Sequence, residues 1–289
     1  MMKKIVYSLL IAGATFAACD PIEDRDSLSG SISVAELDIS ATPLVVDGVN
    51  SNKIILKNNS PVLSQWDYGL GVSLKAADTI LMVVPGTQTI SFTGLNGDGS
   101  EITKELSVTV DELTFEVPAQ WEYLCGTGEK KWVWDESLGK IWGNGGYRGS
   151  VKPDWWGRTL ADIEEETAYA GWDANSFMTF SITDGAVFSK SNSTGTKIET
   201  GSFQFDMSDT ILYNGGADVW ASGELKITGT TILQGISQND GKVTVYTFDI
   251  IKLSADQMVL AYKTRSGDNG SNWGEWGGEA WFWVFKPEE

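Results

Sequence analysis

The sequence predicts an all-β protein with two domains, and three observations carry this prediction. Short runs of β-branched and aromatic residues recur along the chain, separated by Asn, Gly and Pro, as in strands joined by turns. Glycine occurs 32 times and tryptophan 13 times, a composition that suits strands and tight turns better than helices. Only residues 158–169 have helical character, because the acids between Asp162 and Glu166 would suit the first turns of a helix. A length of 289 residues is typical of two domains.

Composition and charge exclude several classes of function. The chain has 21 Lys and Arg residues against 39 Asp and Glu residues, and its net charge of -18 repels phosphate backbones, which excludes a nucleic-acid partner. The count of histidines is 0, which excludes Ser-His-Asp and Cys-His catalysis and every zinc site that needs histidine. Two cysteines are too few for a Cys-rich metal site. We therefore expect no cofactor and no metal, while a calcium role for Asp268 and Asn269 stays open beside their ordinary role in a turn.

Residues 1–18 have the pattern of a signal peptide. A positive start at Lys3 and Lys4 precedes a mostly apolar run that is too short to span a bilayer. Phe16-Ala17-Ala18-Cys19 resembles the bacterial lipoprotein cleavage box, which implies that Cys19 is the lipidation site. Acyl chains contribute about 0.8 kcal/mol per buried methylene, so a multiply acylated cysteine would hold firmly to a membrane. Ordinary cleavage after Ala18, which would leave a free thiol, is the alternative.

Residues 19–34 form an acidic stretch with Ser and Gly, which predicts a solvated tether. This stretch resembles the acidic export signal of Bacteroidetes-type lipoproteins, which implies an outer-membrane location facing the cell exterior. Removal of the signal peptide leaves 19 basic against 39 acidic residues, a net charge of -20.

Residues 35–112 alternate in the manner of strands and predict a small sandwich. Asn96-Gly97-Asp98-Gly99 is a hairpin turn between two runs, since glycine adopts a positive φ at no steric cost. Trp66-Asp67-Tyr68-Gly69-Leu70-Gly71 is similar to the WDFGDG signature of PKD domains, and residues 84–92 are similar to the strand that follows it. The resemblance implies an immunoglobulin-like spacer domain whose core is filled by Trp66. Leu70 stands where the signature has its second aspartate. The strand candidates are residues 45–46, 53–57, 80–84, 88–92 and 106–110.

Residues 119–289 form the second predicted domain, and twelve of the 13 tryptophans follow residue 120. Seven or eight strands with one short helix indicate an all-β sandwich or barrel. Residues 245–262 resemble the closing strands of lipocalin-like lipoprotein domains, a likeness that leaves sandwich and closed barrel both open. The strand candidates are residues 131–134, 177–182, 197–205, 224–227, 242–253, 258–262 and 279–285.

An aromatic cluster between residues 131 and 156 predicts a sugar site. A pyranose ring offers a C–H face to an aromatic plane and hydroxyls to polar partners, and tryptophan supplies apolar area with little rotamer entropy to lose. Residues 143–149 are predicted to be mostly loop because of their glycines. Trp132 and Trp134 share one face of a strand, which favours the core for at least one of them. The candidate ligand-binding residues are Trp142, Asn144, Tyr147, Arg148, Asp154, Trp155 and Trp156.

A second glycine-rich segment, residues 267–279, adds Trp273, Glu275 and Trp276 as candidates. The run that follows, residues 280–285, is apolar on both faces and predicts a buried central strand, so Trp281 and Trp283 are assigned to the core.

Because histidine is absent, an enzyme with this sequence would have to use carboxylates as its catalytic groups, as glycosidases do. Asp135, Glu136, Asp154, Glu275 and Glu279 lie in the aromatic regions, but with 39 acids in the chain a chance pairing is easy, so the prediction is a protein that is not an enzyme. Cys125 lies in a strand-like segment and is predicted to be a buried structural thiol.

The sequence as a whole resembles the accessory glycan-binding lipoproteins of starch-utilisation-type systems in Bacteroidetes. The resemblance implies a lipid-anchored surface protein that captures a polysaccharide or oligosaccharide beside an outer-membrane transporter. The negative charge favours a neutral glycan. The alternatives are a lipocalin-like binder of a small apolar ligand, a structural envelope protein, and a glycoside hydrolase that uses a carboxylate pair.

Overall fold

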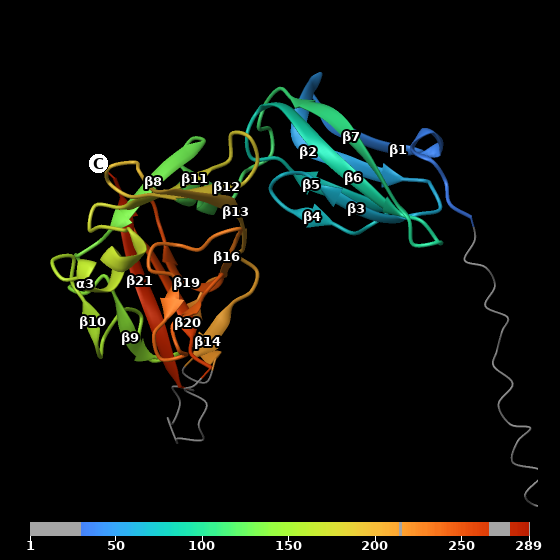
Figure 1. Cartoon of the computed structure of the whole chain (residues 1–289). Coiled ribbons are helices and arrows are strands. Elements are labelled where there is room, and N and C mark those ends of the chain that lie inside the picture. The colour runs from blue at the N-terminus through green and yellow to red at the C-terminus, as the bar shows by residue number, and fades with distance from the viewer. Residues whose placement is uncertain (1–29, 214–215, 266–277, 289) are drawn as a thin grey trace, which may run out of the picture.

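The computed structural model describes residues 30–213, 216–265 and 278–288, and it confirms the all-β prediction. Within this part of the chain, strands β1 to β21 are joined by loops and a few short helices. The strands form two bodies, a smaller one from β1 to β7 and a larger one from β8 to β21, which Figure 1 shows side by side. None of the described helices is long and apolar enough to cross a membrane. Cys19, Asp268, Asn269, Trp273, Glu275 and Trp276 lie outside the described residues.

The smaller body is a sandwich of two antiparallel sheets, as predicted. Its strand orders are β1-β2-β5 and β4-β3-β6-β7. Trp66 is fully buried among the apolar side chains of both sheets, with its ring centroid 4.5 Å from that of Phe92, and its Nε1 donates to the carbonyl of Lys75. Trp66 therefore fills the core of the smaller body, as predicted. The elements are η1 (Val34–Glu36), β1 (Ile39–Val46), β2 (Val49–Asn58), β3 (Leu63–Asp67), β4 (Val72–Ser73), β5 (Ala77–Leu81), β6 (Gly86–Leu95) and β7 (Glu101–Val110).

The hairpin between β6 and β7 turns where the sequence predicts it. Asn96 N donates to Ser100 O over 2.8 Å, and Gly99, with a φ of 86°, donates to Asn96 O. The positive φ is the conformation that glycine adopts without steric cost. Strands β3 and β4 were not predicted, because a five-residue and a two-residue strand with few β-branched residues give little periodic signal.

The larger body is a closed barrel. Each of the strands β8, β11, β12, β13, β16, β19, β20 and β21 pairs antiparallel with the next, and β21 pairs back with β8. Closure removes the exposed strand edges that an open sheet would present. The elements are α2 (Ala119–Cys125), β8 (Glu129–Trp134), β9 (Trp142–Gly146), β10 (Gly157–Arg158), α3 (Glu164–Thr167), η2 (Ala168–Ala170), β11 (Phe177–Ser181), β12 (Val187–Ser191), β13 (Ile198–Asp206), β14 (Ile211–Tyr213), β15 (Asp218–Ala221), β16 (Glu224–Thr228), β17 (Ile236–Ser237), β18 (Val243–Thr244), β19 (Thr247–Leu253), β20 (Met258–Lys263) and β21 (Glu279–Pro287).

Side chains fill the barrel interior. Trp132 and Trp134 are both buried there, together with Phe188, Phe248 and Trp283 from other strands. An eight-stranded barrel has an interior just wide enough for such side chains or for one small ligand. The residues 229–246 between β16 and β19 also enter this core, through Ile232 and Leu233. A core packed in this way differs from the open, aliphatic lumen that a lipocalin-like binder of apolar ligands would require.

Strand β21 is buried on both faces, as its sequence predicts. Trp281 and Trp283 point into the barrel core, whereas Phe282 and Val284 belong to a separate cluster on the outer side. The hairpin β14–β15 covers that outer side through Trp220, whose Nε1 donates to Ser150 O over 2.6 Å.

The helices differ from the prediction in position. Cys125, expected in a strand, ends the helix α2, which is anchored because Lys130 Nζ donates to Tyr123 O and Trp132 Nε1 donates to Leu124 O. The thiol is fully buried, and burial raises its pKa to about 12, so the predicted structural role holds although the local structure does not. The helical character expected over residues 158–169 is found only in α3 and the adjoining η2, since residues 157–158 pair as a strand.

The two bodies meet through the loop that resembles the PKD signature. Gly69 O accepts a hydrogen bond from Ala186 N over 2.8 Å, and a Cβ built on Gly69 would lie 3.3 Å from the Cα of Gly185. Both glycines have a positive φ, which allows the two backbones to approach this closely. The smaller body therefore contacts the barrel at the β11–β12 turn, on the side away from β9 in Figure 1.

Candidate functional site

The candidate site lies at the end of the barrel where β21 begins. Here β9 pairs with β21 in the register Asn144↔Trp281 and Trp142↔Trp283, so these four side chains share the inner face of the barrel. We call this region the β9 end and define it as Trp142, Asn144, Trp156, Glu279 and Trp281, together with the loop of residues 229–246. In Figure 1, β9 and the start of β21 lie in the lower part of the barrel, away from the smaller body.

Strand β9 corrects one sequence expectation. Residues 143–149 were predicted to be mostly loop, but Trp142–Gly146 forms a strand whose glycines face a closely packed backbone. A Cβ built on Gly143 would lie 2.2 Å from the carbonyl oxygen of Trp156 and 2.5 Å from the Cα of Gly157. Glycine at this position therefore lets the following segment fold directly onto β9, which brings Trp156 to the barrel end.

Three indole rings form the apolar part of the β9 end. The ring centroids of Trp142 and Trp281 are 4.7 Å apart, and Trp156 contacts both rings edge to face at 5.7 and 5.8 Å. Trp142 and Trp281 are buried, whereas Trp156 is 42% exposed. Trp156 thus lies between the two buried indoles and solvent. Edge-to-face contacts of this kind fix ring orientation, so Trp156 presents a defined surface.

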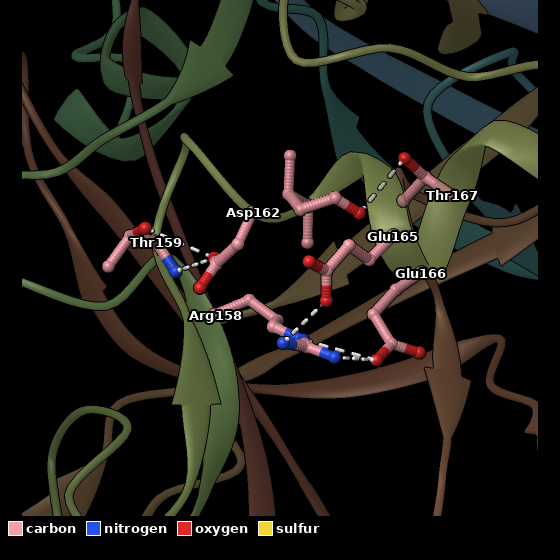
Figure 2. A network of polar contacts seen from close by, with 7 residues as sticks. Arg158, Thr159, Asp162, Glu165, Glu166 and Thr167 are labelled. Carbon is pink, nitrogen blue, oxygen red and sulfur yellow. Dashed lines mark hydrogen bonds and ion pairs between the residues drawn. The ribbon is translucent and has the colours of Figure 1, made fainter.

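A polar network on the neighbouring helix holds Trp156 from another side. The Arg158 guanidinium lies 5.1 Å from the centre of the Trp156 ring. Figure 2 shows the two contacts that hold the guanidinium in place. Arg158 donates to Glu166 over 2.6 Å and pairs with Glu165 over 3.0 Å, and both acids belong to α3. Asp162 accepts from Thr159 N in the same view, which closes the loop between β10 and α3. The acids expected in the first turns of a helix therefore position an arginine over a tryptophan.

A buried carboxylate forms the polar part of the β9 end. Glu279 is 7% exposed, and its side chain accepts hydrogen bonds from Asn144 Nδ2, from Asn239 Nδ2 over 2.6 Å and from Thr264 Oγ1 over 3.4 Å. Asn144 also accepts from Trp156 N over 2.9 Å through Oδ1. One amide therefore ties the carboxylate to the backbone of the exposed tryptophan.

The loop of residues 229–246 runs along the inner face of β21. At one point Trp283 Nε1 donates to Gln234 O over 2.8 Å, and at another Asn239 reaches Glu279. Four buried polar atoms in this region have no hydrogen-bond partner among the described residues: Nε1 of Trp142, Nε1 of Trp281, Nε2 of Gln234 and Oε1 of Gln238. Buried polar groups are nearly always paired, so such a concentration requires an explanation.

A second polar cluster, between β12, β13 and the segment that follows β16, has a structural role. Lys190, which is 4% exposed, pairs with Glu199 over 3.1 Å, and its Nζ lies 4.7 Å from the centre of the Trp172 ring. Burial alone would raise the pKa of Glu199, but hydrogen bonds from Thr230 and Lys190 outweigh it and lower that pKa to about 2. These groups satisfy one another, as a buried ion pair must if it is to be tolerated.

The structure brings together some of the predicted site residues and separates others. Tyr147 lies on the outer side of β21, with its ring 4.8 Å from Trp220, and so faces away from Trp142. Arg148 is half-buried in the turn after β9 with a φ of 60°. Asp154 and Trp155 are exposed, and their backbone N–H groups donate to Asn144 O. The predicted residues that meet at the β9 end are Trp142, Asn144 and Trp156.

Several residues of the β9 end were not predicted as site residues. Trp281 was assigned to the core from its apolar strand, and its position in the core is correct. Glu279 was considered only as one of many acids, and Arg158 only as part of a helix. No sequence pattern indicated that Gln234, Gln238 and Asn239 belong to a site. A polar segment that folds into a barrel has the same composition as one that stays in solvent.

Comparison with known proteins gives little further information. No family model matches the chain, and no curated protein matches its sequence. The PKD1 domains of the Vibrio cholerae metalloprotease PrtV and of Vibrio anguillarum Epp align with 26% of this chain, at 19% and 17% identity and a TM-score of 0.22, over 95% and 90% of their own lengths. A carbohydrate-binding module of the β-sandwich superfamily aligns over 87% of this chain and 90% of its own, at 8% identity and a TM-score of 0.21. Likenesses this low carry no conclusion about function.

Proposed function

We propose that the protein binds a neutral glycan without catalysis, at the β9 end of the barrel. The observation that carries the proposal is Trp156, a 42% exposed indole fixed by Trp142, Trp281 and Arg158. An exposed aromatic ring held from several sides offers a flat surface and has little conformational entropy to lose on binding. A sugar ring stacks its C–H face on such a surface.

The polar groups beside Trp156 suit the edge of a sugar. Asn144, Asn239 and Glu279 provide amide and carboxylate groups, the kinds of partner that hydroxyls bind bidentately. The Glu279 carboxylate and the net charge of -18 both disfavour an anionic polysaccharide. A neutral polysaccharide or oligosaccharide is therefore the ligand class that fits.

The remaining parts of the proposal concern location. We propose that Cys19 carries a lipid anchor in the outer membrane, that the acidic segment after it is a tether, and that the PKD-like sandwich is a spacer. The support is the residue pattern around Cys19 and the sandwich that follows. In this arrangement the β9 end faces away from the sandwich. The β9 end would then be accessible to glycans beside a transporter.

The test of glycan binding is the variant Trp156→Ala. Titration of the mature chain with a panel of neutral polysaccharides should give a saturable change in tryptophan fluorescence. Loss of the stacking surface should weaken binding by about 10- to 100-fold, the range of a central aromatic contact. The same titrations, assayed for new reducing ends, should show no cleavage.

Trp155→Ala is the matched control, because Trp155 is the neighbouring residue and is 37% exposed, and no ring contact joins it to Trp142 or Trp281. We expect this variant to keep its affinity, and both variants to keep the melting temperature of the parent within a few degrees. Equal affinities for parent and Trp156→Ala would place the glycan elsewhere, and the absence of any response would reject glycan binding.

The anchor is tested by Cys19→Ser. In cells that process lipoproteins, we expect the parent to partition into the detergent phase and the variant into the aqueous phase, because the acyl chains supply the membrane affinity. Aqueous partitioning of the parent would favour ordinary cleavage after Ala18.

A further inference from the structure

The four unpartnered polar atoms of the β9 end lie in one layer of the molecule. The carbonyl of Gln234 accepts a hydrogen bond from Trp283, and the side chain of Asn239 donates one to Glu279. Residues 234–239 therefore run beside the inner face of β21 from position 283 to position 279. Trp281 lies between these two points on the same face, and Trp142 packs against it. The indole N–H groups of Trp142 and Trp281 and the amides of Gln234 and Gln238 therefore occupy the layer between this loop and strands β9 and β21.

This layer has an excess of hydrogen-bond donors. Trp142, Trp281 and Gln234 each contribute an unpartnered N–H group, whereas Gln238 contributes one unpartnered acceptor oxygen. Trp142, Trp281 and Gln234 are no more than 6% exposed. Buried donors without partners cost free energy, and a ligand that supplies an acceptor recovers that cost on binding. The complementary ligand group accepts more hydrogen bonds than it donates.

The charge and shape of the surroundings narrow the class of that group. The buried Glu279 carboxylate in the same region repels an anionic acceptor such as a carboxylate or a sulfate. The indole faces of Trp142 and Trp281 favour an apolar part beside the acceptor. An acetamido group combines these properties: its carbonyl oxygen accepts from two donors, its N–H donates to one acceptor, and its methyl group packs on an aromatic face.

We propose that the β9 end recognises a 2-acetamido sugar, with the sugar ring stacked on Trp156 and the acetamido group directed to the N–H groups of Trp142 and Trp281. This proposal rests on the proposed glycan binding and names its ligand class. Trp156 contacts both buried indoles and separates them from solvent, so the acetamido group of a sugar stacked on Trp156 reaches these donors when the Trp156 ring shifts aside.

The experiment uses the ¹⁵N-labelled mature chain and methyl glycosides as probes, so that no linkage has to be assumed. N-acetylglucosamine and N-acetylgalactosamine are compared with glucose and galactose, which differ in the 2-substituent. We expect at least 10-fold tighter binding of the acetamido sugars, with large shifts of the indole N–H resonances of Trp142 and Trp281. Trp142→Phe and Trp281→Phe assign these resonances.

Trp281→Phe also provides the decisive variant, since it keeps an aromatic ring and removes one N–H group. It should weaken the binding of the acetamido sugar several-fold more than the binding of glucose, whereas Trp156→Ala should weaken both sugars alike. Equal affinity for acetamido and hydroxyl sugars, with unmoved indole resonances, would overturn the acetamido proposal and leave glycan binding intact. No binding of any sugar or polysaccharide would overturn both.

Discussion

Replacing Trp283 with alanine is expected to lower the free energy of unfolding by about 4–5 kcal/mol, the upper part of the range for a buried tryptophan. Trp283 is 0% exposed, packs edge to face on Phe248 at 5.2 Å and donates Nε1 to Gln234 O. The variant therefore loses core packing and also the bond that fixes residues 229–246 inside the barrel. Urea unfolding followed by far-UV circular dichroism measures the change.

The comparison for Trp283→Ala is Trp155→Ala, which removes a ring that is 37% exposed and should therefore cost clearly less. Trp283→Phe keeps most of the apolar volume and should lie between the two. Amide hydrogen exchange in residues 229–246 should become faster in Trp283→Ala, because their anchor is gone. A cost as small as that of Trp155→Ala would mean that Trp283 does not fill the barrel interior.

Much of this fold is predictable because strand periodicity is a local property. The apolar run at residues 280–285 predicts a strand buried on both faces, and β21 is such a strand. The turn at residues 96–99 is fixed by glycine conformation alone. Cys125 shows the limit, since Tyr123 and Leu124 suit a strand and a helix equally, and tertiary contacts from Lys130 and Trp132 select the helix.

Closure of the barrel and the composition of the site are not local properties. The pairing of β21 with β8 joins residues about 150 positions apart, and nothing in either strand distinguishes a barrel from a sandwich. The glycines of β9 were interpreted as loop residues because glycine is common in loops. Glycine also permits close backbone approach within a strand, and only the fold shows which of the two reasons applies. Trp156 was a candidate from sequence, whereas its supports Arg158 and Glu166 were not, because a helix face with acids is usually solvated.

Asp249→Asn is expected to stabilise the protein by about 2–3 kcal/mol at pH 8 and to have almost no effect at pH 4. Asp249 stands opposite Glu224 in the β16–β19 pairing. Burial, together with the charges of Glu224 and Asp209, raises the pKa of Asp249 to about 6, above the usual value of 3.8 for an aspartate. A shift of one pKa unit corresponds to about 1.4 kcal/mol.

The sign follows from linkage between ionisation and folding. Because the pKa of Asp249 is higher in the folded state than in the unfolded state, its contribution to stability is complete below about pH 4 and is lost as the pH rises through about 6. Asparagine carries no charge at any pH, so the variant keeps that stability at pH 8. The free energies of unfolding of parent and variant should therefore diverge between pH 4 and pH 7.

Asp206→Asn separates this cause from a general reduction of negative charge. Asp206 lies in the same cross-strand row, opposite Glu224, but it is exposed and hydrogen bonds from Ser208 lower its pKa. Its removal takes away the same charge and also a favourable contact, so no gain in stability at pH 8 is expected. If Asp206→Asn stabilised the protein as much as Asp249→Asn, the effect would come from the net charge of -18 and not from burial of one carboxylate.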